Sequence, residues 1–313
     1  MRAPEFWSRR GAASALLSPL GALYGASVAL KARVARPFRA AAVVISVGNL
    51  TAGGSGKTPL ARAVGARLLD RGRRVFFLTR GYGGREAGPY QVAMGDGADR
   101  VGDEALLLAE RAPTIVARRR AEGARLAVAR GAEIIVMDDG HQNFSVVKDL
   151  SLVVVDGESQ FGNGCMIPAG PLREPVRQGL ARADAVIVMG SGNPDLGHYR
   201  GTVLSARLLP EENPLDRKRV FAFSGIGRPE KFVATLHQVG AFVDGARFFA
   251  DHHRFAAREI AALRKSAAGR LLVTTEKDFV RLKPADREGI VVLKVRALFD
   301  DDHALAQIIN RVA

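Results

Sequence analysis

The chain has 313 residues, which is enough to bury a large core and suggests two domains. Its formal net charge of +14 favours an anionic partner, such as nucleic acid, an acidic membrane surface or a phosphorylated substrate. The single cysteine, Cys165, excludes a disulfide framework and a cysteine-based zinc site, and it fits a reducing cytosol.

The first 40 residues combine positive charge with an uncharged stretch. Residues 1–40 contain seven Lys and Arg against one acid, Glu5, and residues 11–30 carry no charge. That stretch approaches the roughly 20 residues that span a bilayer, but its Ser, Gly and Pro residues make it only mildly apolar. We expect a helix that lies in the interface of an anionic leaflet, with Trp7 at headgroup level. A true span and an ordinary soluble helix are the alternatives.

A glycine-rich loop follows an apolar run at residues 41–47 and precedes a helical pattern at residues 58–71. The order of strand, glycine-rich turn, Lys-Thr and helix is typical of a P-loop, whose backbone N–H groups bind the phosphates of a nucleotide. Its residues are Thr51, Ala52, Gly53, Gly54, Ser55, Gly56, Lys57 and Thr58, with Thr51 where a glycine usually stands. We expect Lys57 to reach the β- and γ-phosphates and Thr58 to bind Mg²⁺. The alternative is a glycine-rich turn with an exposed lysine.

Short apolar strands alternate with helical patterns in the rest of the chain, which predicts parallel α/β layers. We expect strands at 41–47, 74–79, 114–117, 133–138, 151–155, 184–189 and 202–208, and helices at 58–71, 103–111 and 119–130. Residues 210–216 contain two prolines and predict a linker. Beyond it we expect strands at 219–224, 241–248, 271–275 and 290–294, and helices at 229–238, 256–266 and 303–312. Two α/β domains with a cleft between them follow from this pattern.

Acidic residues end one predicted strand and begin one predicted helix. Asp138 and Asp139 follow the apolar run at 133–137, where an acid beside a P-loop strand holds Mg²⁺; an ordinary Asp-Asp-Gly surface turn is the alternative. Asp103 opens the helix at 103–111, and the residues alone favour a helix cap over a general base there.

Three further segments carry candidate site residues. In Asp251-His252-His253, neighbouring side chains of an extended segment point apart, which disfavours joint metal binding; one histidine could orient a carboxylate, or cap a helix in solvent. The glycine- and proline-rich residues 161–175 predict a loop that borders a site, where Arg173 could bind phosphate. Residues 274–278 resemble a base-contacting loop, and a helix N-cap explains them equally well.

Taken together, these motifs are similar to those of the tetraacyldisaccharide 4'-kinase family, the lipid A 4'-kinases of Gram-negative bacteria. The similarity covers most of the chain. Its ordered motifs are residues 46–58, 79–83, 102–104, 138–140, 168–175, 251–252 and 275–278. The resemblance implies a P-loop kinase-like domain with a parallel sheet flanked by helices (41–209), a smaller α/β domain (217–313) whose last helix can pack back on the first, and an N-terminal membrane-associated helix (1–40).

The resemblance also implies an activity and roles for single residues. The family moves the γ-phosphate of ATP to the 4'-hydroxyl of a tetraacylated glucosamine disaccharide 1-phosphate, at the cytoplasmic face of the inner membrane. The implied residues are Asp103 as base, His252 as its assistant, Lys57 on the donor, Thr58, Asp138 and Asp139 on Mg²⁺, and Arg173 and Asn49 on substrate or phosphate. For Asp103 this implication replaces the helix-cap interpretation.

One motif departs from the family, which commonly reads Asp-Asp-Gly-x-Gln-His where this chain has Asn143 last and a histidine at His141. We therefore assign no role to His141 or Asn143. A P-loop ATPase or GTPase switch without a lipid acceptor is the main alternative function. A nucleic-acid-binding protein is suggested by charge alone, and an aromatic content of only 6% disfavours it.

Overall fold

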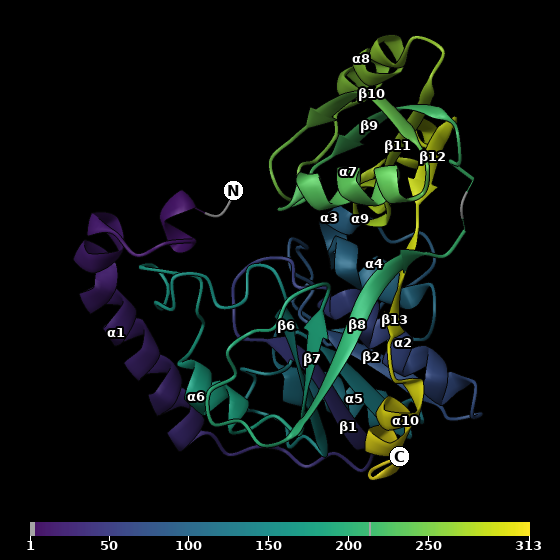
Figure 1. Cartoon of the computed structure of the whole chain (residues 1–313). Coiled ribbons are helices and arrows are strands. Elements are labelled where there is room, and N and C mark those ends of the chain that lie inside the picture. The colour runs from purple at the N-terminus through teal and green to yellow at the C-terminus, as the bar shows by residue number, and fades with distance from the viewer. Residues whose placement is uncertain (1–3, 213) are drawn as a thin grey trace.

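The computed structural model describes residues 4–212 and 214–313 and contains two sheets (Figure 1). Arg2 and Asn213, which belong to the predicted basic N-terminus and linker, lie outside these residues. The larger sheet has nine strands in the order β13-β8-β7-β6-β1-β5-β2-β4-β3. Seven neighbouring strands, β8 through β4, are parallel, and β13 and β3 are antiparallel edges. The smaller sheet has four parallel strands in the order β10-β9-β11-β12.

The strands of the larger sheet are β1 (Val43–Asn49), β2 (Val75–Thr79), β3 (Tyr90–Gln91), β4 (Thr114–Val116), β5 (Ile134–Asp138), β6 (Leu150–Asp156), β7 (Ala185–Met189), β8 (Thr202–Pro210) and β13 (Val295–Phe299). Those of the smaller sheet are β9 (Arg219–Ser224), β10 (Phe242–Phe248), β11 (Leu271–Thr275) and β12 (Ile290–Leu293). The helices are α1 (Ala12–Val34), α2 (Lys57–Leu69), α3 (Ala98–Val101), α4 (Asp103–Ala109), α5 (Arg120–Ala129), α6 (Val176–Leu180), α7 (Pro229–Gln238), α8 (Ala257–Ala267), α9 (Glu276–Arg281) and α10 (Asp302–Asn310), with short 3-10 turns at Glu5–Trp7 and Pro284–Asp286.

The larger sheet is buried on both faces, as its continuous apolar runs predict. Every residue of β2, β5, β6 and β7 is buried. One face packs against α2 and α10, and α5 contributes Ala124 and Ala127 to the core on the other face. The α/β architecture and its mostly parallel sheet confirm the predicted fold class. They also place the carboxyl ends of β1, β5, β2 and β4 along one edge.

The chain returns to the larger sheet after it has built the smaller one. β13 pairs antiparallel with β8, and Figure 1 shows these two strands running side by side toward the smaller sheet. The sequence pattern predicted no strand at residues 295–299, because the apolar residues there continue the run that forms β12. α10 then buries Leu305, Ile308 and Ile309 in the core cluster that also contains Leu60 and Val64 of α2.

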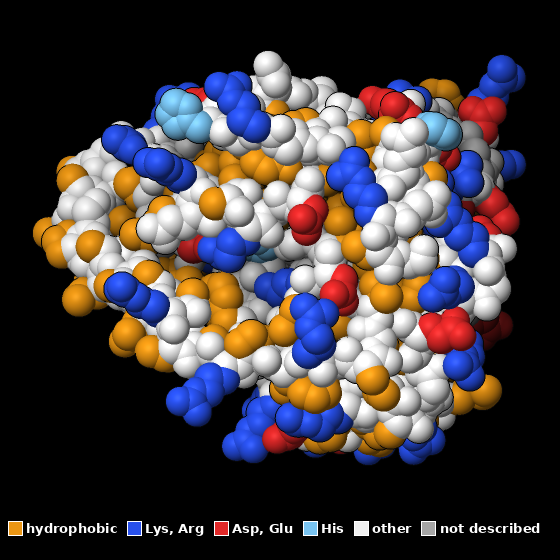
Figure 2. Space-filling model, turned by 90° about the horizontal axis from the view of Figure 1, so that it is seen from below, with side chains coloured by type: hydrophobic (Ala, Val, Ile, Leu, Met, Phe, Trp, Pro, Cys, Tyr) orange, Lys and Arg blue, Asp and Glu red, His pale blue; other side chains and the backbone are white. Residues whose placement is uncertain are grey.

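The N-terminal helix α1 runs along one flank of the larger sheet (Figure 1). Its small residues face the body, since a Cβ on Gly21 would meet the backbone oxygen of Met166 at 2.9 Å. Its leucines face outward: Leu16 is 80% and Leu23 is 68% exposed. Figure 2 shows apolar side chains along this flank with Lys and Arg beside them. α1 is long and apolar enough to cross a membrane, which by itself is weak evidence of membrane association.

Leu305 tests the contribution of α10 to the core. The Leu305→Ala variant removes a side chain that is fully buried against α2, so we expect unfolding in urea to need about 2–5 kcal/mol less free energy. Leu16→Ala changes an exposed leucine and should stay within about 0.5 kcal/mol of the unmodified chain. Equal effects of the two substitutions would contradict this packing.

Candidate active site

The P-loop lies where β1 ends and α2 begins. Gly53 and Gly56 have φ angles of +116° and +84°, in the left-handed region that glycine adopts without strain. A Cβ on Gly53 or Gly54 would meet no atom within 4 Å, so the loop backbone faces open space. Lys57 is the first residue of α2, and the N–H groups of that first turn are available to an anion.

Asn49 and the loop at 166–173 hold the P-loop in shape. The Asn49 side chain is buried and donates from Nδ2 to the oxygen of Thr51 at 2.7 Å and to Ser55 Oγ at 2.9 Å. Thr51 forms an antiparallel bridge with Leu172, and Arg173 N donates to Leu50 O at 2.8 Å. The structure thus places Asn49 beneath the loop and Arg173 at its border.

Asp138 ends β5, the strand beside β1, and lies next to the P-loop helix. Its Oδ2 accepts a hydrogen bond from Thr58 Oγ1 at 2.8 Å, as the two candidate Mg²⁺ ligands would require. Its other oxygen, Oδ1, is buried and has no hydrogen-bond partner among the described residues. Burial and the charge of Glu104 raise the pKa of Asp138 to about 7. A bound cation would relieve both costs.

Asp139 follows with φ +55° and has the opposite environment. Lys57 Nζ lies 3.6 Å from its Oδ1, and Arg173 Nη1 donates to its two oxygens at 2.8 and 2.9 Å. Burial would raise the pKa of Asp139, but Lys57 and Arg173 outweigh it and hold the pKa well below its usual range. The structure therefore brings the P-loop lysine, the acid pair and Arg173 together.

Asp103 is the first residue of α4 and lies between the two sheets. Its carboxylate is buried and accepts from Arg281 through Nε, at 2.9 Å, and through Nη2. His252 Nδ1 lies 3.3 Å from the same oxygen, Oδ2. Burial opposes ionisation, but His252, Lys277 and Arg281 keep the pKa of Asp103 well below its ordinary value. The N-cap position belongs to Gly102, so the structure does not support the interpretation of Asp103 as the helix cap.

The two histidines after Asp251 point to different partners. His252 has φ +58°, and its ring lies edge-on against Tyr82 with the centroids 5.0 Å apart. His253 instead approaches Glu259 Oε2, with its Nε2 at 3.0 Å. The two side chains therefore have different partners, although His252 is in the left-handed region and not in the extended conformation expected for this segment.

Helix α9 joins the smaller sheet to the larger one through ion pairs. Glu276 accepts from Arg62 of α2 at 2.7 Å, and Lys277 donates to Glu104 of α4 at 2.8 Å. Asp278 accepts from Arg281 Nη1 at 2.9 Å, which fixes the guanidinium that contacts Asp103. Thr275 Oγ1 accepts from the N–H of Asp278, so Thr275 is the N-cap residue of α9, as one of the two interpretations of this segment predicts.

The sequence pattern missed Arg281 and Arg62. Arg281 follows Asp278 by three residues, a spacing that places both side chains on one helix face and could have pointed to it. Nothing in the local pattern separates Arg62 from Arg67, the other arginine in the middle of α2.

His141, to which we assigned no role, lies under the P-loop strand. Its ring nitrogens lie 3.1 Å from Ser151 Oγ and 3.0 Å from the oxygen of Gly179. A Cβ at Gly48 would meet His141 Cβ at 2.5 Å, so β1 needs a glycine at this point. Burial lowers the pKa of His141 to about 4, although the Glu174 carboxylate at 3.8 Å opposes this shift.

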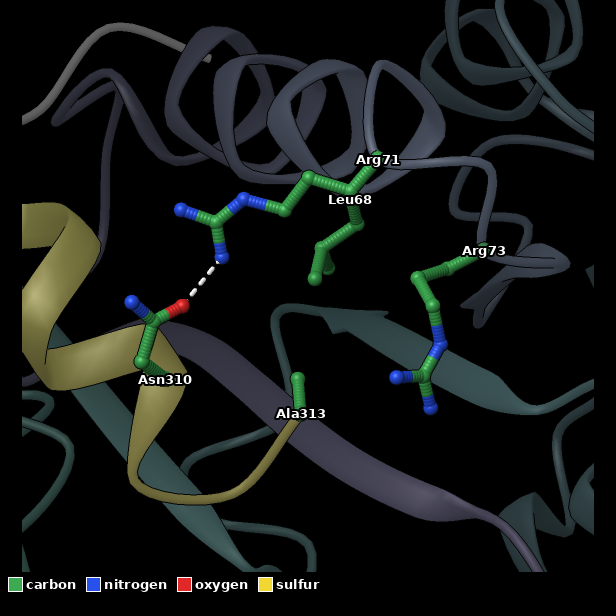
Figure 3. A pocket seen from close by; sticks show the side chains of 5 residues that line it. All are labelled: Leu68, Arg71, Arg73, Asn310 and Ala313. Carbon is green, nitrogen blue, oxygen red and sulfur yellow. Dashed lines mark hydrogen bonds between the residues drawn. The ribbon is translucent and has the colours of Figure 1, made fainter.

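Two surface cavities lie away from this edge. One, of about 390 Å³, is lined by Leu68, Arg71, Arg73, Asn310 and Ala313, at the opposite end of α2 from Lys57 (Figure 3). Arg71 and Asn310 are hydrogen-bonded across it. The other, of about 660 Å³, lies beside Arg39, Arg73 and Arg311. None of the predicted site residues lines either cavity.

A P-loop at the end of one parallel strand, with an acid pair at the end of the next, defines a P-loop nucleotide-binding α/β protein. A family model described as tetraacyldisaccharide-1-P 4'-kinase matches residues 13–313. The chain belongs to this family, which makes it a kinase.

Relatives and a solved structure match nearly the whole chain. The tetraacyldisaccharide 4'-kinases of Paramagnetospirillum magneticum and Rhodospirillum rubrum are 51% and 50% identical to it. The alignments cover 100% of this chain and 99% and 98% of those proteins. The crystal structure of the "apo" form of LpxK from Aquifex aeolicus in complex with ATP has a TM-score of 0.77 and 26% identity. It covers 95% of this chain and 98% of that chain.

His141 predicts a pH dependence of stability. Its folded pKa of about 4 is below the unfolded value near 6.5, so its contribution is complete above about pH 6.5 and is lost as the pH falls toward 4. Between about pH 7.5 and 4.5 the loss should be on the order of 2–3 kcal/mol. The measurement is the free energy of unfolding in urea at both pH values, for the unmodified chain and for His141→Gln. An unchanged pH dependence in the variant would contradict the buried neutral histidine.

Proposed function

We propose that this kinase transfers the γ-phosphate of ATP to the 4'-hydroxyl of a tetraacylated glucosamine disaccharide 1-phosphate, a step of lipid A biosynthesis. One observation carries the proposal. The P-loop with Lys57 and a buried carboxylate, Asp103, meet at the same edge of the larger sheet, where donor and base must converge. The names of the relatives support this choice of acceptor, and the ATP in the related crystal structure supports the choice of donor.

The donor site is built from the P-loop and its neighbours. The backbone N–H groups of residues 52–58 and the Lys57 ammonium bind the phosphates of ATP, and Arg173 assists at the border of the loop. Asn49 is buried, so its hydrogen bonds to Thr51 and Ser55 support phosphate binding by fixing the loop. Fixed positive groups of this kind stabilise the charge of the transferred phosphoryl group.

Thr58, Asp138 and Asp139 fit Mg²⁺. No group of three or more His, Cys, Asp or Glu gathers within residues 4–212 and 214–313, but Mg²⁺ typically takes one or two carboxylates together with substrate phosphates and water. The orphaned Asp138 Oδ1 beside the Thr58 hydroxyl is the kind of oxygen that such an ion needs. When bound, Mg²⁺ neutralises phosphate charge and orients the donor.

Asp103 accepts the proton of the attacking hydroxyl in this proposal. Its low pKa keeps it ionised at neutral pH but also makes it a weak base, so its action in this proposal depends on position rather than on basicity. His252, 3.3 Å from Asp103 Oδ2, orients the carboxylate from the smaller sheet and stabilises its charge. The residue ranges 41–209 and 217–313 are the two domains that we propose to meet here, with residues 1–40 as the membrane-associated segment.

The acceptor is a lipid, and α1 gives the chain a surface that fits a membrane. The exposed leucines enter the acyl region of the cytoplasmic leaflet of the inner membrane, and the neighbouring Lys31 and Arg33 contact anionic headgroups. ATP reaches the enzyme from the same, cytoplasmic side of the membrane.

Transfer of labelled phosphate from ATP to the detergent-dispersed disaccharide 1-phosphate tests the function. We expect a bisphosphorylated product that depends on Mg²⁺. Asp103→Asn should lower kcat by about 10²–10⁴, and Lys57→Ala should lower it more. Asp99→Asn, which alters an exposed carboxylate paired with Arg85, is the matched control and should keep full activity.

The outcomes separate the alternatives. ATP hydrolysis without transfer in the unmodified chain would favour a P-loop switch protein over a lipid kinase. Near-normal turnover in Asp103→Asn would remove Asp103 from the role of base, and transfer that survives Lys57→Ala would contradict the P-loop assignment.

Co-flotation with vesicles of phosphatidylethanolamine and phosphatidylglycerol tests the role of α1. The triple variant Leu16→Ser, Leu20→Ser, Leu23→Ser removes three exposed leucines and should weaken partitioning by about 10²–10³-fold. Val203→Ser, Phe242→Ser, Leu271→Ser removes three exposed apolar side chains from strands and should bind like the unmodified chain. Equal binding of both triple variants would place the membrane contact elsewhere.

A further inference from the structure

Arg120 is a buried cation that the activity described above does not use. It is the first residue of α5 and is 3% exposed. Its Nη1 donates to the backbone oxygen of Ala117 at 2.5 Å. Its Nε is buried without a hydrogen-bond partner, and no described carboxylate lies within ion-pair distance. A buried guanidinium with no anion in direct contact is unfavourable, so the site can take an anion that arrives from outside the chain.

The strand order places Arg120 near the transfer. At the carboxyl edge of the sheet, β1 leads to the P-loop, β5 to Asp138 and Asp139, β2 to Arg80, and β4 to Arg120. Arg120 therefore lies on the other side of the acid pair from the P-loop. Burial lowers the pKa of Arg120 to about 10, the charges of Asp139 and Asp138 oppose this shift, and Arg80 adds to it. Asp138, Asp139 and Arg80 are therefore the charged groups that act on Arg120.

The acceptor approaches from the same side. Helix α4, which begins with Asp103, packs against β4 and β2, the strands that precede Arg120 and Arg80 in the chain. Lys57 and Arg173, on the donor side, already share the charge of Asp139. Arg120 lies within electrostatic reach of Asp139 and Asp138 but forms no direct ion pair with a described residue, so its guanidinium can still bind an incoming anion.

We propose that Arg120 is a further catalytic residue, whose guanidinium binds the phosphoryl group in transfer and then the phosphate monoester of the product. The inference rests on the proposed function. As the acceptor oxygen forms its bond to phosphorus, the bond from phosphorus to the β–γ bridging oxygen breaks and the hydroxyl proton passes to Asp103. Arg120 keeps its own protons and donates them as hydrogen bonds to the non-bridging oxygens. The planar guanidinium fork matches two phosphate oxygens, which suits this task better than an ammonium does.

The alternative is a purely structural role, in which Arg120 holds the turn between β4 and α5 through its hydrogen bond to Ala117. Three variants separate the two roles: Arg120→Met, Arg120→Lys and Arg119→Met. The last changes the preceding arginine, which is exposed and paired with Glu122, and serves as the matched control. The readouts are kcat and KM for ATP, the affinity for the disaccharide 1-phosphate and for the bisphosphorylated product, and the urea midpoint.

For Arg120→Met we expect kcat to fall about 10²–10³-fold, with KM for ATP changed less than about threefold. Product affinity should fall while affinity for the 1-phosphate substrate stays unchanged, and the urea midpoint should stay or rise. Arg120→Lys keeps the charge and should recover part of kcat, and added guanidinium should raise the rate of Arg120→Met. Arg119→Met should match the unmodified chain in every readout.

Two outcomes would overturn the inference. One is near-normal kcat and product affinity in a folded Arg120→Met or Arg120→Lys. The other is a lowered urea midpoint in Arg120→Met together with full kcat in Arg120→Lys, which assigns a structural role to the side chain. Both are read against a chain that transfers phosphate, so they differ from a failure of the proposed function, in which the unmodified chain makes no product.

Discussion

The ion pair between Asp103 and Arg281 is the contact on which the arrangement of the site depends. Their side chains are only 2% and 5% exposed, and breaking a buried ion pair by removing one partner typically costs about 3–5 kcal/mol. Because Asp103 begins α4 beside the larger sheet and Arg281 ends α9 beside the smaller one, the pair fixes the two sheets to each other at the proposed base. The smaller sheet is thus a wall of the site, held there by the same charge that the proposed chemistry uses.

Asp138 and Asp139 illustrate how position decides the behaviour of identical side chains. Asp139 meets Lys57 and Arg173 and is kept ionised, whereas burial and Glu104 push Asp138 toward its neutral form despite Lys57 and the Thr58 hydroxyl. Two adjacent carboxylates therefore divide the roles, one balancing fixed cations and the other offering a free oxygen. Arg120 is a similar case with the opposite charge, since its Nε is buried without a hydrogen-bond partner among the described residues. The unpartnered Asp138 oxygen and the unpartnered Arg120 Nε both mark positions where a ligand could bind.

Much of the fold and of the candidate site could be predicted from local sequence. The P-loop and the buried strands were predictable because glycine spacing and continuous apolar runs are local properties, and the Asp138–Asp139 pair follows from its place at a strand end. Asp103 was different, since its residues alone favour a helix cap, and only Arg281 and His252, far along the chain, give it another environment. β13 was missed because its apolar residues continue those of β12, and the change of sheet depends on pairing with β8. Arg62, Arg120 and Arg281 are three arginines among many, distinguished only by what surrounds them.

The position of α10 has a consequence for how the protein is made. Leu305, Ile308 and Ile309 belong to the same core cluster as Leu60 and Val64 of the helix that carries Lys57 and Thr58, so residues far along the chain complete the core beneath the P-loop helix. Domains generally fold as units during synthesis, beginning from the N-terminus. Here the larger sheet remains incomplete until β13 and α10 have been synthesised, and a chain truncated before them would present its apolar face to chaperones and proteases. A nucleotide site that matures only once α10 is in place would keep unfinished copies from consuming ATP.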